Sequence, residues 1–471
     1  MKYVIVIGDG MADNPVEELG GMTPLAYASI PVMDSLAQRG ELGSARMIPD
    51  GVTPGSDTAI LSIFGYNPQI YYAGRSPLEA AGCGVKLEAG DVSYRCNMVA
   101  LEDGPMPYRE KHILSHSGGS VDGESAIALL AYLLEDEGFR ACAEKNRMAF
   151  YPNPSFRHIA VQKGADIRGL TAIPPHDHLG EVIGGLLPRG CDMASGLAEM
   201  MELAHGLLDR HPINEARRAE GKLPANSIWL WAEGAAITLP SFWDKYHKDG
   251  FVMSAVPLVW GIGALAGLRY TTVPGATGEL DTDFEGKTDG VLEGLAQGAD
   301  FALLHIEAPD ECTHNGDTQG KIRAIEWLDS RCIARLVDGL ERRGEDFRLL
   351  ILSDHKTLTS TRGHDGDPVP YILYDSRQGG GRENAHVDRY SGGHDGKTGD
   401  AQAGVGGGGG GGSREGKQAS GSGGSREGKQ ASGSGLPYTE ATAAKGPYME
   451  VGRHLIERLF EMASDETDER Q

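Results

Sequence analysis

The chain has 471 residues, of which 40% are hydrophobic, and a formal net charge of −23. This length can hold two or three domains that each bury a core, and the acidic balance disfavours nucleic acid and anionic membranes as partners. We find no apolar run of the roughly 20 residues that cross a bilayer, no signal peptide before the first strand-like segment, and no C-x-x-C pair among six cysteines. The composition therefore predicts a cytoplasmic globular protein with reduced thiols.

The beginning of the chain has the pattern of an α/β fold. An apolar strand is expected at Tyr3–Ile7, a helix over Pro31–Gly40, and a further helix beginning at or just after Ser56. Alternation of strands and helices predicts a mostly parallel sheet with helices on both faces, and it places the chemistry at the carboxyl ends of the strands.

The pattern changes between about residues 112 and 225. Helical segments at Glu124–Leu134 and Leu197–Asp209 and a strand-like segment at Phe156–Gln162 are separated by proline-rich turns. This composition predicts a smaller α+β domain that interrupts the first one.

A second α/β pattern runs from about Ser227 onward. The expected strands are Ile228–Trp231, Val252–Val256, Phe301–Ile306 and Leu349–Leu352. Helices are expected over Lys321–Leu340 and Tyr448–Met462, where apolar residues recur at three- and four-residue spacing. We therefore expect a discontinuous core made of residues 1–111 and 226–471, around the inserted domain.

Residues 377–435 form a low-complexity segment within that core. It contains the uninterrupted glycine run Gly406–Gly412, and the sequence Ser-Arg-Glu-Gly-Lys-Gln-Ala-Ser-Gly-Ser occurs twice, from Ser413 and from Ser425. Such a composition offers little apolar surface to offset the entropy of ordering, so the sequence predicts a flexible surface loop.

Acidic and histidine residues follow the expected strands and surround one serine in the sequence pattern. The candidates are Asp9, Ser56, Asp310, His314, Asp354, His355 and His364. Two divalent cations about 4 Å apart can clamp the attacking and leaving oxygens of phosphoryl transfer and activate a hydroxyl. A serine at a helix N-terminus can attack while backbone N–H groups hold phosphate oxygens. Mixed oxygen and imidazole ligands suit Mn²⁺, Zn²⁺ or Co²⁺. The pattern indicates a two-metal phosphoryl-transfer centre.

Each of these residues also has an ordinary structural explanation. A serine before a helix is commonly an N-cap, and an Asp-Gly pair after a strand, as at Asp9, is commonly a turn. Asp310 and His314 are four apart and could form a surface pair on one helical face. Asp354 and His355 could lie in a solvated loop. The agreement of the candidates with one another, rather than any single motif, supports the metal centre.

At these motifs the sequence closely resembles the archaeal type of cofactor-independent phosphoglycerate mutase, within the alkaline phosphatase superfamily. The resemblance is carried by many ordered motifs and covers nearly everything outside residues 377–435. They include Gly8-Asp9-Gly10-Met11, Pro54-Gly55-Ser56-Asp57, Tyr71-Tyr72-Ala73-Gly74-Arg75-Ser76-Pro77, Pro224-Ala225-Asn226-Ser227, Glu307-Ala308-Pro309-Asp310-Glu311 and Ser353-Asp354-His355.

The resemblance implies an alkaline-phosphatase-like core that is interrupted by a smaller substrate-binding domain, residues 112–225. It also implies a transient phosphoserine at Ser56. One metal ion would take Asp9, Ser56, Asp354 and His355, and the other would take Asp310, His314 and His364. The ions are expected to be Mn²⁺, with Zn²⁺, Co²⁺ or Mg²⁺ as alternatives. The phosphoryl group would pass from 3-phosphoglycerate to the serine and back to the 2-hydroxyl of the same glycerate, without bisphosphoglycerate.

Such a reaction implies cationic groups that hold the glycerate and exclude water. The candidates are Arg157 and His158 in the inserted domain, with Lys287 and Arg75 in the core. Ordinary exposed surface charge is the alternative for each of them.

The chain departs from the family pattern at two places. It has Lys356 and Leu358 where the family usually has proline in Asp-His-Pro-Thr-Pro, and Cys312-Thr313 where the family usually has Ala-Gly before the histidine. The ligand positions themselves are retained. Two other activities stay open at this stage: a homoserine kinase-like phosphotransferase, against which the lack of a Walker-type loop counts, and a metal-dependent phosphatase.

Overall fold

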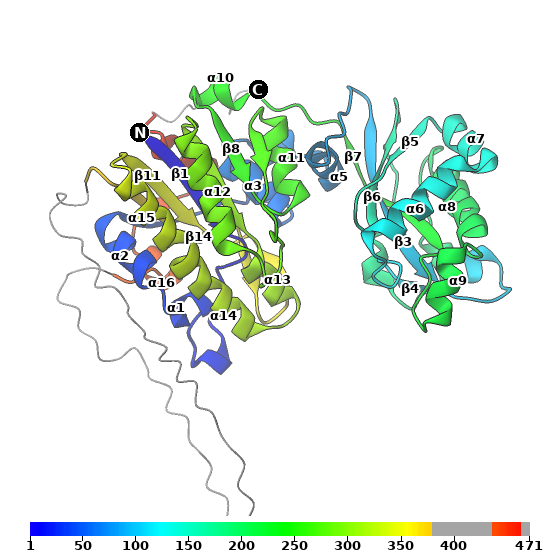
Figure 1. Cartoon of the computed structure of the whole chain (residues 1–471), viewed down its shortest axis with the longest axis horizontal. Helices are drawn as coiled ribbons and strands as arrows, with labels where there is room; N and C mark the ends of the chain where they lie inside the picture. Colours follow the sequence, from blue (N-terminus) through cyan, green and yellow to red (C-terminus); the bar gives the residue numbers. More distant parts are fainter. Residues whose placement is uncertain (379–435, 463–471) are drawn as a thin grey trace, which may run out of the picture.

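The computed structural model describes residues 1–378 and 436–462. The ribbon forms two lobes, a larger one that contains the N-terminus and a smaller one built from the cyan and green middle of the chain (Figure 1). The low-complexity segment predicted at 377–435, with its expected flexibility, lies outside the described residues except for its first two positions.

The larger lobe is organised around an eight-stranded sheet. Its strand order is β15 (Tyr448–Met449), β2 (Glu41–Ala45), β14 (Val369–Asp375), β11 (Phe347–Leu352), β1 (Lys2–Gly8), β10 (Phe301–Ile306), β8 (Gly250–Met253) and β9 (Arg269–Thr271). All pairings are parallel except those of β14 with its two neighbours. The predicted mostly parallel sheet of an α/β fold is therefore confirmed.

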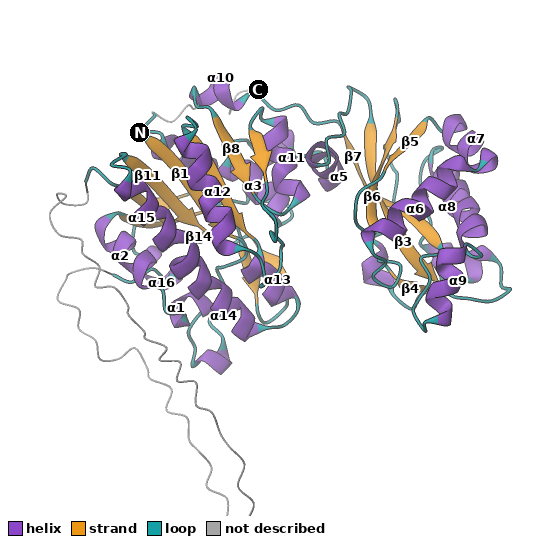
Figure 2. Ribbon diagram, viewed as in Figure 1, coloured by secondary structure: helices purple, strands orange, loops and turns teal. Residues whose placement is uncertain are grey.

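Helices cover both faces of this sheet (Figure 2). In β1, Val4 and Val6 pack into one hydrophobic core and Ile5 and Ile7 into the other, because successive side chains of a strand point to opposite faces. The first core includes side chains of α1 (Pro24–Tyr27), α2 (Pro31–Arg39), α12 (Phe284–Ala296), α14 (Thr318–Trp327) and α15 (Ala334–Arg342). The second includes side chains of α3 (Ser56–Ile63), α10 (Phe242–Tyr246), α11 (Pro257–Leu265) and α17 (Leu455–Leu459). Continuous apolar strands such as β1 are typical of a sheet buried on both faces.

The smaller lobe contains a five-stranded antiparallel sheet with its own core. The strands are β3 (Val92–Leu101), β4 (Ile113–Ser115), β5 (Met148–Tyr151), β6 (Arg157–Gln162) and β7 (Ser227–Ala235). The helices of this lobe are α6 (Gly123–Glu135), α7 (Glu137–Lys145), α8 (Ala194–Leu208) and α9 (Pro212–Ala219). Buried residues of this sheet and of these helices form a separate cluster. The expected α+β character of the interruption is thus present.

The strand expected at Ile228–Trp231 exists as β7, but it pairs with β3 in the smaller sheet rather than joining the larger one. If the inserted domain ran only from residue 112 to residue 225, as expected, β3 and β7 would both be assigned to the larger lobe. An apolar run shows that a strand is buried and does not identify its partner. We propose that the inserted domain runs from about residue 91 to about residue 236.

Two expected helices differ from the structure. The stretch Lys321–Leu340 is helical, but it includes a π-helical segment at Leu328–Ile333 between α14 and α15. The terminal helix expected over Tyr448–Met462 is shorter, because the chain first adds β15 to the large sheet and only then forms α17. At the C-terminal segment the pairing of β15 with β2 outweighs the local helical periodicity.

The described helices include none that is both long and apolar enough to cross a membrane. All six cysteines are unpaired, as the sequence predicted.

Two helices at the junction between the lobes approach each other through glycine. A Cβ atom at Gly261 of α11 would lie 1.7 Å from the carbonyl oxygen of Leu78, in α5 (Arg75–Gly82). A Cβ at Gly82 would lie 1.9 Å from the carbonyl oxygen of Pro257. Only glycine allows this contact between backbones. The contact fixes α5, which Figure 1 places between the two lobes.

We predict that Gly261→Ala destabilises the protein by about 1–3 kcal/mol, because the added methyl group forces α11 away from α5. The matched control is Gly206→Ala in α8, where a Cβ would meet nothing within 4 Å. The free energy of unfolding of this control should rise by about 0.5–1 kcal/mol, because alanine has a higher helix propensity than glycine. Urea unfolding of both variants measures the difference, and equal stabilities would contradict the close packing.

Candidate active site

The predicted acidic residues gather at one edge of the large sheet. Asp9 follows β1, Asp354 follows β11, and Asp310 lies in α13 (Ala308–His314), which begins just after β10. β1 pairs in parallel with both β10 and β11, so the carboxyl ends of the three strands lie side by side. The three carboxylates are 4% exposed or less. The structure thus brings together residues that are hundreds of positions apart.

Ser56 joins this cluster as the first residue of α3. Its Oγ lies 3.4 Å from Asp9 Oδ2 and 3.2 Å from His355 Nε2. The first N–H groups of a helix lack intrahelical acceptors and favour an anion. The serine is therefore placed where a phosphate oxygen could meet both the helix terminus and the acidic cluster.

The histidines complete two overlapping groups of potential ligands. Ligand atoms of Asp9, Asp354 and His355 lie within 4.8 Å of one another, and so do those of Asp310, His355 and His364. His314 Nε2 lies 3.0 Å from Asp310 Oδ2 and 3.0 Å from His364 Nε2. All seven residues singled out in the sequence therefore meet, and His355 stands between the two groups rather than in the first alone.

The cluster has the properties that divalent cations require. Asp9 Oδ1 and Asp354 Oδ2 are buried without a hydrogen-bond partner, which is costly for a carboxylate oxygen unless a cation is near. Burial, and then the neighbouring Asp354, raise the pKa of Asp9 well above its usual range. Burial would also raise the pKa of Asp310, but hydrogen bonds from His314 and His364 hold it well below its usual range. Oxygen and imidazole donors of this kind fit Mn²⁺, Zn²⁺ or Co²⁺.

Gly10 explains the Asp-Gly pair at the end of β1. It has a φ of +57°, and a Cβ there would lie 2.3 Å from Thr357 Oγ1 and 2.6 Å from Asp310 Oδ1. Its N–H donates to Asp354 Oδ1 at 3.1 Å. The glycine is thus needed both for the backbone conformation and for the space beside the Thr357 hydroxyl and the Asp310 carboxylate.

Sequence reasoning missed two residues that contact the cluster. His305 in β10 has Nε2 2.9 Å from Asp9 Oδ2 and Nδ1 3.2 Å from Ser254 Oγ. Burial lowers the pKa of His305 to about 3, so the ring is neutral and carries one proton, on the nitrogen facing Asp9 or on the nitrogen facing Ser254. Thr357 in β12 (Lys356–Leu358) donates to Asp310. A histidine inside the apolar run Phe301–Ile306 was a usable signal, whereas Thr357 gave none.

The expected cationic groups are distributed over both lobes. Arg75 begins α5 and its Nε lies 3.3 Å from Glu79 Oε1. Arg157 begins β6, its guanidinium lies over the Phe156 ring, and its buried Nε has no hydrogen-bond partner. Burial, and then Arg95, lower the pKa of Arg157 to about 10. An unpartnered buried donor beside other arginines is suited to an anionic ligand.

His158 does not lie with Arg157. It is fully buried inside the smaller lobe, where its Nδ1 accepts from the N–H of Asn153 at 3.1 Å. Neighbouring residues of a strand point to opposite faces, so Arg157 and His158 could not both face one ligand. The expectation that His158 binds substrate is not supported by this position.

Lys287 is buried in α12 and donates to the carbonyl oxygen of Thr277 at 3.1 Å. Burial lowers its pKa to about 8. Burial likewise raises the pKa of Glu307 to about 8, against the opposing effects of Arg75 and Lys287. Lys287 therefore lies close to the acid cluster, but its ammonium group already has an acceptor.

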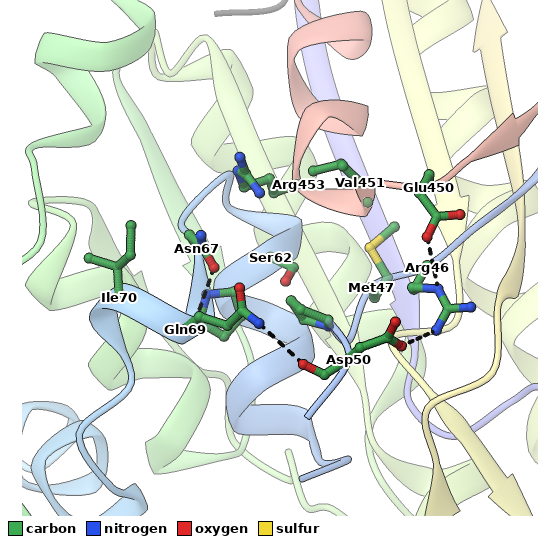
Figure 3. A pocket seen from close by; sticks show the side chains of 13 residues that line it. Arg46, Met47, Asp50, Ser62, Asn67, Gln69, Ile70, Glu450, Val451 and Arg453 are labelled. Carbon is green, nitrogen blue, oxygen red and sulfur yellow. Dashed lines mark hydrogen bonds and ion pairs between the residues drawn. The ribbon is translucent and has the colours of Figure 1, made fainter. Parts of the chain in front are cut away.

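A separate surface pocket of about 500 Å³ lies at the other end of α3 (Figure 3). It is lined by Ser62 near the end of that helix and by segments around residues 46–50, 67–70 and 450–453. Arg46 in this pocket pairs with Asp50 at 2.7 Å and lies 3.6 Å from Glu450. None of the predicted site residues lines it.

Comparison with known proteins finds sequence relatives of this chain. A family model described as 2,3-bisphosphoglycerate-independent phosphoglycerate mutase matches residues 37–214. Relatives with that name from Methanothrix thermoacetophila and Methanosarcina acetivorans are 46% and 45% identical to this chain. The matches cover 80% and 79% of this chain and 91% and 90% of the relatives.

Solved structures show the same fold. A protein from Pyrococcus horikoshii has a TM-score of 0.69 and 26% identity, over 98% of both chains. A cofactor-independent phosphoglycerate mutase from Thermoplasma acidophilum has a TM-score of 0.50 and 24% identity, over 80% of this chain and 90% of that one.

The mostly parallel sheet between two layers of helices, with a buried cluster of carboxylates, imidazoles and a serine at the ends of its strands, defines an α/β enzyme. The sequence relatives narrow this class. The chain belongs to the family of 2,3-bisphosphoglycerate-independent phosphoglycerate mutases.

We predict that Asp354→Asn weakens the stabilisation that added Mn²⁺ gives to the metal-free protein. A ligand present at 100 times its Kd stabilises the native state by about 2.7 kcal/mol, and losing one anionic ligand removes part of that gain. Thermal unfolding with and without Mn²⁺ measures it. Asp338→Asn, a change of an exposed residue in α15, is the control and should keep the full gain. A full gain in Asp354→Asn would argue against a cation at this carboxylate.

Glu79 and Arg95 form a buried ion pair, and their side chains are 9% and 7% exposed. Burial alone would raise the pKa of Glu79, but Arg95 holds it at about 2, against an ordinary 4.5. A carboxyl with a lowered folded-state pKa stabilises the protein above about pH 4.5 and loses this contribution as pH falls towards 2.

Glu79→Gln should therefore destabilise the protein by about 3–5 kcal/mol at pH 7, because it leaves Arg95 buried without a counter-ion. The difference from the unsubstituted protein should shrink as pH falls from about 4.5 to about 2. Denaturant unfolding across this range measures it. Glu199→Gln, which removes the exposed pair with Lys145, should change stability little at any pH.

Proposed function

We propose that this protein interconverts 3-phosphoglycerate and 2-phosphoglycerate as an intramolecular phosphotransferase, with Ser56 as the transient acceptor. The observation that carries the proposal is the position of Ser56 Oγ, at a helix N-terminus and 3.2–3.4 Å from His355 and Asp9. The family membership supplies the substrate. An acidic chain can bind such an anion because the local cluster and its cations override the global charge.

In the first half of the reaction Ser56 Oγ loses its proton and attacks the phosphorus of 3-phosphoglycerate. The bond from phosphorus to the C3 oxygen breaks, and that oxygen takes up a proton. In the second half the 2-hydroxyl of the same glycerate loses its proton and attacks the phosphorus of the phosphoserine. The bond from phosphorus to Ser56 Oγ breaks, and Oγ takes a proton back. Asp9 Oδ2 and His355 Nε2 orient the serine oxygen for both steps.

We propose that two divalent cations complete the centre, with Mn²⁺ preferred. Asp9, Ser56, Asp354 and His355 would hold one, and Asp310, His314 and His364 the other. Bound there, the cations would neutralise charge on the phosphoryl oxygens and favour the deprotonated hydroxyl. The buried unpartnered oxygens of Asp9 and Asp354 support this assignment.

Arg157 and Arg75 are the proposed glycerate-binding residues. They come from the smaller and the larger lobe, and α5, which begins with Arg75, packs against β3, β6 and β7 of the smaller lobe. Cationic groups on both sides could hold the glycerate while it turns over and keep water out. Lys287 is proposed to support the cluster from the larger lobe. A cytoplasmic location is consistent with this role and remains a proposal.

Two other reactions of the same centre are distinguished by one assay. The purified protein is incubated with Mn²⁺ and 3-phosphoglycerate, and formation of 2-phosphoglycerate is followed by coupling to enolase. Product formation supports the mutase. Release of inorganic phosphate alone would instead indicate a phosphatase, and ATP-dependent phosphorylation of homoserine without mutase activity would indicate a kinase-like transferase.

We predict that Ser56→Ala lowers kcat by about 10³-fold or more, because the acceptor of the phosphoryl group is lost. Binding of Mn²⁺ at Asp310, His314 and His364 should persist. Ser62→Ala on the same helix is the matched control, since Ser62 is buried but faces the separate pocket, and it should keep nearly full activity. Mutase activity retained in Ser56→Ala would rule out the phosphoserine.

A further inference from the structure

One buried hydroxyl contacts both groups of potential metal ligands. Thr357 Oγ1 lies 2.5 Å from Asp310 Oδ1 and 3.2 Å from His355 Nδ1. Asp310 belongs to the group with His364, and His355 also belongs to the group with Asp9. Thr357 itself is 0% exposed, so the hydroxyl is inaccessible to bulk water. Its hydrogen bonds must be made within the protein.

The chemistry of the three groups fixes the direction of these bonds. A hydroxyl has one donor and two acceptor positions, and an ionised carboxylate only accepts. Thr357 Oγ1 therefore donates to Asp310 and can accept only from a protonated Nδ1 of His355. The carbonyl oxygen of Lys356, 3.3 Å from the same Nδ1, is a second acceptor for that proton. With the proton on Nδ1, the lone pair of His355 Nε2 points towards Ser56 and Asp9, as a ligand must.

The hydroxyl is held in place from several directions. In the hairpin of β12 with β13 (Gly363–Asp365), Thr357 is the cross-strand partner of His364. Its N–H donates to the carbonyl oxygen of Ala12 at 3.1 Å. Its own carbonyl oxygen accepts from Lys321 Nζ at 2.6 Å.

Lys321 is also 0% exposed and donates to Asp13 Oδ2 at 2.8 Å. Asp13 in turn accepts from Thr359 Oγ1 at 2.6 Å, in the chain that follows β12. A buried ammonium with a paired carboxylate is costly unless its hydrogen bonds are satisfied, and here Asp13 Oδ2 and the Thr357 carbonyl oxygen both accept from it within 2.8 Å. The Lys321–Asp13 pair thus fixes the backbone on which the hydroxyl stands.

We propose that Thr357 is a positioning residue that orients both halves of the metal centre at once. Its hydroxyl occupies Oδ1 of Asp310 and the proton of His355 Nδ1, so that Oδ2 of Asp310 and Nε2 of His355 are left to bind cations. Binding of a cation to one group of ligands should therefore favour binding of a cation to the other group. The inference rests on the proposed metal centre, and it does not depend on which phosphoryl-transfer reaction the centre performs.

The test uses the full chain and Mn²⁺ alone. Isothermal titration calorimetry of the metal-free protein measures the affinity for the ion, without any substrate. Thr357→Val keeps the shape of the side chain and removes the hydroxyl, and it should lower the affinity by about 10- to 100-fold, as loss of an outer-shell partner typically does. Thr357→Ser restores the hydroxyl and should bring the affinity back to within a few-fold of the original. An unchanged affinity in Thr357→Val overturns the proposal.

Thr288→Val is the matched control. Thr288 is equally buried, but its Oγ1 donates to the carbonyl oxygen of Phe284 within α12. This variant should keep the Mn²⁺ affinity of the original even if it unfolds at a lower temperature. A loss equal to that of Thr357→Val would show that any buried hydroxyl has the same effect, and would also overturn the proposal.

A second measurement covers the case in which Thr357→Val does not fold. In the unsubstituted protein loaded with diamagnetic Zn²⁺, nitrogen NMR of the imidazole rings identifies the tautomer of His355. The proposal requires the proton on Nδ1, and a proton on Nε2 would contradict it. If the enolase-coupled assay showed no mutase activity, the Mn²⁺ affinities and the tautomer of His355 would still test the role of Thr357. The proposed function and the proposed role of Thr357 can therefore fail independently.

Discussion

The central constraint on this fold is the burial of three carboxylates within one small volume. Asp9, Asp310 and Asp354 are each 4% exposed or less, and two of their oxygens lack any hydrogen-bond partner. Like charges at this separation oppose one another, and burial makes the repulsion stronger. That negative charge is offset by the surrounding histidines, by the helix terminus at Ser56 and by the proposed cations. The three residues lie close together because β1 pairs in parallel with β10 and β11, which places the carboxyl ends of the three strands side by side.

The residues that contact the carboxylates are themselves held by hydrogen bonds to further residues. His305 and Thr357 contact the acids directly. Lys321 donates to the carbonyl oxygen of Thr357 and is paired with Asp13. Gly10 keeps the space between these groups open, because even a methyl group would collide with two of them. Lys356, which replaces the proline usual in the family, donates to Asn14 and Asp367 and so ties the hairpin to the loop after β1. The departure from the family pattern therefore leaves the ligands in place.

The sequence indicated the elements and the acids of the site, because both leave local signals. A continuous apolar run predicts a strand buried on both faces, and an acid placed just after it predicts a functional edge. Pairing is not local, so the partner of β7 followed only from the sheet register. The opposite orientations of Arg157 and His158, in contrast, follow from the alternation of side chains along the expected strand Phe156–Gln162. Thr357 was hidden for the same reason, since its importance comes from a carboxylate 47 positions away. The π-helical segment Leu328–Ile333 likewise continues a helical periodicity and leaves no separate signal.

The chain that follows residue 435 is anchored in the body of the larger lobe. Tyr438 is fully buried, with its hydroxyl donating to the carbonyl oxygen of Pro370 and its N–H donating to Asp34. Glu440 accepts from Thr23 Oγ1 and from the N–H of Asp13, the partner of Lys321. These contacts join the two parts of the polypeptide independently of the covalent connection between them. A protease that severs the backbone between residues 379 and 435 should consequently leave a nicked enzyme whose fragments co-migrate under native conditions and separate only in denaturant.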